Sequence, residues 1–177
     1  MKKILSAVII FCVMIFSANC QARQIPVADE SVKSFYGRVI ASAKKIPLLN
    51  LSVAEHSKGL TRWYCDFRPL SNSSYVGTIN FYENDEGYLH SVEILSYNDH
   101  QDNFHTAKAL AFVGIFHFLV NTRSEVEIVY NQFLSQISAG NYQPVCSVWS
   151  YAKNRNYVIK FSPAGEEDLK ISITAND

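Results

Sequence analysis

The stretch Ala107–Val120 reads AKALAFVGIFHFLV and is apolar at almost every helical position, interrupted only by Lys108 and His117. A helix that is apolar on all sides must be covered on all sides, either by protein or by lipid. Fourteen residues rise only about 21 Å, whereas a bilayer core needs about 20 helical residues. We therefore predict a buried helix at the centre of a soluble domain, running from about Asp102 to Asn121.

Two further helices are expected around this central one. Apolar residues recur at spacings of three and four over Asp29–Lys45, and Pro47 ends that segment. After the central helix, the sequence Thr122-Arg-Ser-Glu125 matches a capping box. It predicts a third helix that Gly140 terminates, so the chain should contain a helical pair as well as an N-terminal helix.

Alternating apolar and polar residues predict seven strands, in one group before the helical pair and one after it. The order of elements predicts an α+β fold: a single domain, residues 23–177, in which an antiparallel sheet of two β-meanders packs on a buried helical pair plus an N-terminal helix. The predicted strands are Leu49–Val53, Trp63–Phe67, Tyr75–Tyr82, Tyr88–Ser96, Val145–Ala152, Tyr157–Ser162 and Leu169–Ile173.

Residues 1–22 have the three-part order of a secretory signal peptide: two lysines, an apolar run and then small residues. We predict cleavage after Ala22 or close to it, and a mature chain that has no transmembrane segment. The short lysine-led signal is typical of bacteria, so the protein is expected in the periplasm or secreted. A lipid anchor on Cys20 is an alternative, although Ser17 and Asn19 depart from the expected lipidation pattern.

Removal of residues 1–22 leaves 14 basic and 16 acidic residues, a net charge of −2. This balance provides no basic surface for nucleic acid, so nucleic-acid binding is excluded from the prediction. Two of the four cysteines, Cys65 and Cys146, remain in the mature chain. Because two cysteines in an exported protein usually pair, we predict a Cys65–Cys146 disulfide.

The sequence contains none of the strong catalytic or nucleotide-binding motifs, and we predict no catalytic residue, no metal and no cofactor. The polar segment with Asp99, His100, Asp102 and His105 has the right residue types for a divalent ion, and His90 is a candidate for a further ligand, but the spacing matches no known site. We interpret this segment as a loop that caps a helix. His117, within the apolar helix, is interpreted as a structural histidine rather than an acid or base.

One pattern indicates recognition of a partner. If Trp63 and Phe67 face the helices, the pleat turns the alternate residues of that strand and of its neighbour outward. Tyrosine and arginine are enriched at protein interfaces. The predicted partner-binding residues are therefore Arg62, Tyr64, Arg68, Asn80 and Tyr82.

These observations favour an exported, non-catalytic module that binds another protein, such as an envelope inhibitor or an immunity protein. Two alternatives remain open at this point. One is a small exported hydrolase that uses the Asp99, His100 and His105 loop. The other is a carrier of a small apolar ligand held between the sheet and the helices, suggested by the 11 phenylalanines and 10 tyrosines.

Overall fold

The computed structural model describes residues 24–42, 48, 51–68, 77–96, 112–119, 145–151, 155–163 and 169–177, together with single positions at 128, 131, 132, 135 and 139. The predicted signal peptide with Cys20, the Asp99–His105 loop and most of the third helix lie outside the described residues. Predictions that concern those segments therefore stay predictions.

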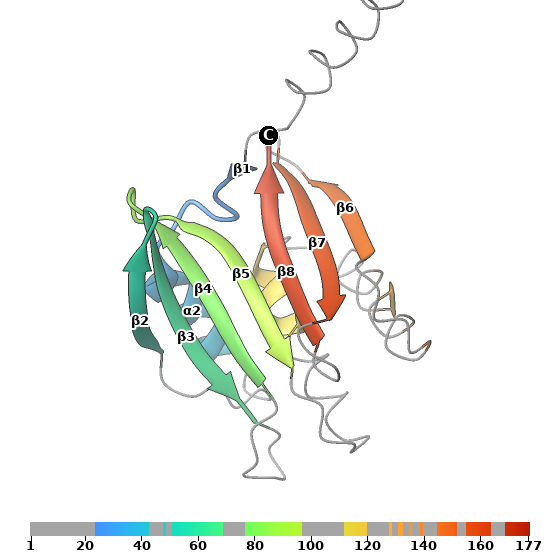
Figure 1. Ribbon diagram of the computed structural model, residues 1–177, viewed down its shortest axis with the longest axis horizontal. Coiled ribbons are helices and arrows are strands. Elements are labelled where there is room, and N and C mark those ends of the chain that lie inside the picture. Colours follow the sequence, from blue (N-terminus) through green and yellow to red (C-terminus); the bar gives the residue numbers. More distant parts are fainter. Residues whose placement is uncertain are drawn as a thin grey trace, which may run out of the picture.

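Within these residues, eight strands form one antiparallel sheet, in which the main order is β2-β3-β4-β5-β8-β7-β6 and β1 pairs with β8 (Figure 1). The sheet thus consists of two meanders that meet where β5 pairs with β8, as Val92 opposite Ile173. This agrees with the predicted antiparallel α+β architecture. The strands are β1 Gln24–Ile25, β2 Ser52–Ser57, β3 Leu60–Phe67, β4 Gly77–Asn84, β5 Leu89–Ser96, β6 Val145–Tyr151, β7 Arg155–Pro163 and β8 Leu169–Asn176.

The helical segments lie on one face of this sheet. Helix α2, Val32–Ser42, lies behind β3 and β4 in Figure 1, and the helical residues 112–119 lie behind β5 and β8. The N-terminus of α2 is capped twice. The Ser31 hydroxyl accepts a hydrogen bond from the Ser34 amide at 3.3 Å, and Glu83 Oε2 on β4 accepts one from the Val32 amide at 2.8 Å.

The core fills the space between the helices and the inner face of the sheet. Phe35 of α2 meets Phe81 of β4 edge to face, with 6.2 Å between ring centroids, and Phe116 meets Tyr157 of β7 at 6.4 Å. The Tyr157 hydroxyl donates to the carbonyl oxygens of Val27 and Leu119, at 3.1 and 3.3 Å. One side chain therefore joins the N-terminal segment, the helix and the sheet.

Within the helical residues 112–119 only His117 is exposed, whereas the hydropathy of the stretch predicted cover on every side. Phe112, Ile115, Phe116 and Leu119 are buried, whereas His117 is exposed. Spacings of three and four place the buried residues on one stripe, and the opposite side is free of the sheet. Among the residues described, no helix has both the length and the hydropathy needed to cross a bilayer.

The first predicted strand is displaced along the chain. We expected a strand at Leu49–Val53, but β2 spans Ser52–Ser57, and Val53 is 56% exposed. The reason is the two-residue turn at Lys58-Gly59, where both residues have positive φ (53° and 74°). Such a turn fixes the register of the hairpin, so Ser52–Ser57 forms the strand that pairs with β3. Leu48, before it, adds an isolated bridge to Phe67.

The disulfide predicted from cysteine counting is absent, because Cys65 is a buried free thiol. Four strands separate β3 from β6 in the sheet, or roughly 24 Å at the usual strand spacing, and a disulfide needs Cα atoms within about 7 Å. The pairing also places the two cysteines in different cross-strand rows. The row of Cys146 contains Lys160, Ser172, Glu93, Asn80 and Tyr64.

Candidate functional site: the open face of the sheet

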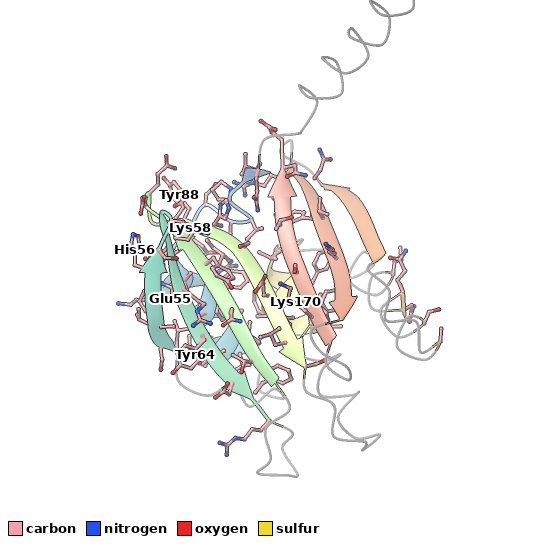
Figure 2. All side chains as sticks on the ribbon, viewed as in Figure 1. Glu55, His56, Lys58, Tyr64, Tyr88 and Lys170 are labelled. Carbon is pink, nitrogen blue, oxygen red and sulfur yellow. The ribbon has the colours of Figure 1, made fainter. Side chains whose placement is uncertain are left out.

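The face of the sheet opposite α2 and residues 112–119 carries the partner-binding residues predicted from the sequence. We call it the open face, and define its centre by Arg62, Tyr64, Asn80, Tyr82, Glu93 and Lys170. Within β3, Cys65 and Phe67 are fully buried on the inner face. The pleat therefore directs Arg62 and Tyr64 to the other side, and Figure 2 shows Tyr64 on this face together with Lys170.

Strand pairing brings four of the five predicted residues together. Arg62 lies directly opposite Tyr82, and Tyr64 lies directly opposite Asn80, in the register of β3 and β4. Directly opposed residues on one face of an antiparallel pair have Cβ atoms about 4.5–5.5 Å apart. The fifth residue, Arg68, follows the end of β3 and is half-buried. The predicted cluster thus has a compact centre of four residues and one member at its border.

Glu93 on β5 connects the predicted residues to the second meander. Its Oε2 accepts a hydrogen bond from the Tyr82 hydroxyl at 2.9 Å, and its Oε1 accepts one from Lys170 Nζ at 3.0 Å. Burial, followed by the neighbouring Glu93 carboxylate, raises the pKa of Tyr82 to about 12. Tyr82 therefore remains a neutral hydrogen-bond donor over the physiological range of pH.

The other charged groups near the centre are also paired. Asp66 Oδ1 accepts a hydrogen bond from the Thr78 hydroxyl at 2.6 Å. Arg62 Nε lies 3.3 Å from Glu55 Oε1, an ion-pair distance, but the geometry is not that of a hydrogen bond. Because the Glu55 side chain is 60% exposed, solvent screens this pair and its net contribution to stability is small. The open face therefore combines both signs of charge with little net excess.

Asn80 is the least exposed residue at the centre of the open face. It is 3% exposed, although it lies on the side of the sheet away from the helices. Its direct neighbours across the strands are Tyr64 and Glu93. Within the described part of the chain its carboxamide makes no side-chain hydrogen bond. The side chain thus places an amide group, surrounded by larger side chains, at the centre of the face.

Glu93 and Lys170 were missed when the sequence was read alone. Alternation does assign Glu93 outward, since Val92 and Ile94 are buried. However, only the pairing of β5 with β8 places Leu95 opposite Lys170, and thereby brings Lys170 close to Glu93. That pairing joins segments about 75 residues apart in the chain, and no local pattern specifies it.

The histidines considered as ligands or bases are spread over the molecule. His117 is exposed on the helix, which contradicts a buried acid–base role. His90 is half-buried at the start of β5, and burial lowers its pKa from the usual 6.5. In the part of the chain that the structure covers, no three His, Cys, Asp or Glu residues gather closely enough to hold a metal ion.

Comparison with known proteins finds no counterpart: no family model, no curated protein and no solved structure matches the chain.

Proposed function

We propose that this chain is an exported bacterial protein that acts by binding another protein through the open face of its sheet. The observation that carries the proposal is the strand register, which makes Arg62, Tyr64, Asn80 and Tyr82 one contiguous group. Tyrosine buries a large area while keeping its hydroxyl bonded, and arginine contacts carboxylates with two parallel hydrogen bonds. An envelope inhibitor or an immunity protein against a secreted toxin would use such a surface.

The arrangement of the helices supports the choice of this face. Helix α2 and residues 112–119 occupy the inner face. We propose that the N-terminal helix and both members of the helical pair expected from the sequence pack on this inner face, the third helix included. An antiparallel sheet covered on one face only leaves its second face for solvent or for a partner.

The decisive measurement is the affinity of a purified partner for matched tyrosine variants. The partner is captured by crosslinking the tagged mature protein in its native host and is identified by mass spectrometry. Tyr64→Ala, on the open face, is then compared with Tyr88→Ala, at the β4–β5 turn, where the tyrosine is 39% exposed (Figure 2). Loss of a central anchor should cost about 2 kcal/mol or more, and Tyr88→Ala should bind normally.

Equal affinity of a folded Tyr64→Ala variant would exclude the open face. Turnover of a substrate by the purified protein would favour the hydrolase alternative instead. Export is tested separately by N-terminal sequencing of protein from the native host, where we expect a start at or near Arg23. An intact Met1 on a cytosolic protein would contradict that part of the proposal.

A further inference from the structure

We propose that Asn80 is the polar anchor of the open face and that it binds an uncharged amide group of the partner. This inference rests on the proposed function, and it adds the chemistry that the face recognises. It starts from a contrast within the face: the Glu93 carboxylate is paired with Tyr82 and Lys170, whereas Asn80, a residue only 3% exposed, has a carboxamide with no side-chain partner among the described residues.

The paired groups exclude a charged anchor at this position. Glu93, directly opposite Asn80, has one oxygen bound by Tyr82 and the other by Lys170. A cation from the partner would have to displace Lys170, and an anion would lie beside the Glu93 carboxylate. The first change leaves Glu93 without its Lys170 partner, and the second places two negative charges side by side. An uncharged group meets neither penalty.

The chemistry of asparagine selects the kind of uncharged group. A carboxamide offers one carbonyl acceptor and two N–H donors in one plane. Its best match is therefore another amide, which presents a donor and an acceptor at the same spacing. Tyr64, opposite Asn80 on β3, supplies an aromatic side chain beside the amide. Such a site discriminates strongly, because a partner group without hydrogen-bonding atoms would leave the Asn80 amide buried and unpaired.

Two sources of an amide exist in a protein partner: the side chain of Asn or Gln, and the peptide backbone. A primary carboxamide has an N–H on the same side as its carbonyl oxygen and can form a two-bond ring with Asn80. A trans peptide group has its N–H on the opposite side and can form only one of these bonds. We expect the primary amide to bind more tightly.

The test uses small probes and the full mature protein labelled with ¹⁵N. Acetamide represents the primary amide, N-methylacetamide represents the peptide group, and acetate is the anionic control of similar size. We expect acetamide to cause saturable chemical-shift changes centred on the Asn80 side-chain NH₂ and its strand neighbours. N-Methylacetamide should bind more weakly, and acetate should cause no saturable change at this position.

The matched variant is Asn80→Leu, which keeps the branched arrangement of four side-chain heavy atoms but is larger and has no hydrogen-bonding atoms. It should abolish the acetamide response, lower the affinity for the captured partner at least tenfold, and leave the melting temperature unchanged or higher. A melting temperature lowered by more than about 5 °C would show that the carboxamide is structural, and would overturn the inference. Absence of an acetamide response, or equal responses to all three probes, would overturn it as well.

These outcomes can be separated from a failure of the proposed function. If Tyr64→Ala weakens the partner while Asn80→Leu binds normally, the open face binds but Asn80 is not its anchor. If Tyr64→Ala binds normally, the face itself is wrong, whatever the probes show.

Discussion

Two glycine-to-alanine substitutions should change stability in opposite directions, for reasons that the fold makes explicit. Gly77 begins β4, where it lies opposite Phe67 on one side and Ser96 on the other. A Cβ atom there would lie 2.1 Å from the carbonyl oxygen of Leu95 and 2.7 Å from the ring of Phe67. The first of these contacts involves the backbone of a central strand, which cannot move without disturbing its pairing.

Gly37 lies in the middle of α2 and is exposed, and a Cβ atom added there would meet nothing within 4 Å. Alanine at such a helical site is favoured over glycine by about 0.5–1 kcal/mol. Overpacking in a closely packed region typically costs about 1–3 kcal/mol, and we expect Gly77→Ala to lose about 3 kcal/mol because backbone is involved. For a domain of this size, 1 kcal/mol corresponds to a shift of about 2–4 °C in melting temperature.

Urea unfolding followed by circular dichroism, with calorimetry in parallel, measures both variants against the parent chain. If Gly77→Ala fails to fold, the double variant Gly77→Ala with Phe67→Leu tests the cause. It removes the ring contact but keeps the contact with the Leu95 carbonyl, so we expect no rescue. The reasoning is refuted if Gly77→Ala unfolds like the parent, or if Gly37→Ala is destabilised.

Three further predictions concern stability. Glu83→Ala should destabilise the protein by about 1–2 kcal/mol in urea unfolding, because the first amide of α2 loses its acceptor. The control variant Glu86→Ala, at an exposed position in the same hairpin, should leave the free energy of unfolding nearly unchanged. Tyr157→Phe should lower the free energy of unfolding by about 1–3 kcal/mol, since the buried carbonyls of Val27 and Leu119 lose their donor; an unchanged melting curve would contradict this. Burial raises the pKa of Cys65 from 9.0 to about 12, so above pH 9 the unfolded chain loses this proton while the folded chain keeps it. Stability should therefore be fully present below pH 9 and fall by up to about 1.4 kcal/mol per pH unit toward pH 12; Cys65→Ala should show a shallower decline, and an identical pH profile would rule this cause out.

Local sequence patterns predicted the strands whose two faces differ clearly. In β3, Cys65 and Phe67 alternate with polar neighbours, and burial follows that alternation. The partner-binding residues on β3 and β4 depended on the same alternation, and the register placed four of them together. Their role in binding stays a prediction, because no comparison bears on it.

The errors came from properties that local patterns do not encode. Hydropathy predicted that residues 107–120 are covered on all sides, but within residues 112–119 the chain exposes His117, one of the two polar interruptions of the apolar run. Counting cysteines carries no distance, so it paired two positions on strands that the sheet separates by four others. Lys170 joined the site only through a pairing between distant segments, which depends on the whole fold.

The junction of β5 with β8 has a consequence for how the chain is made. Val92 of β5 pairs with Ile173 of β8, which is synthesised about 80 residues later. Strand β5 therefore has only one neighbouring strand until β8 is made. Until then, the first meander ends in an open edge of backbone hydrogen-bonding groups, the kind of edge that recruits foreign strands. A chain threaded across a membrane from its N-terminus would present this edge until its last residues arrive. Loss of β8 alone would leave both meanders without the strand that joins them.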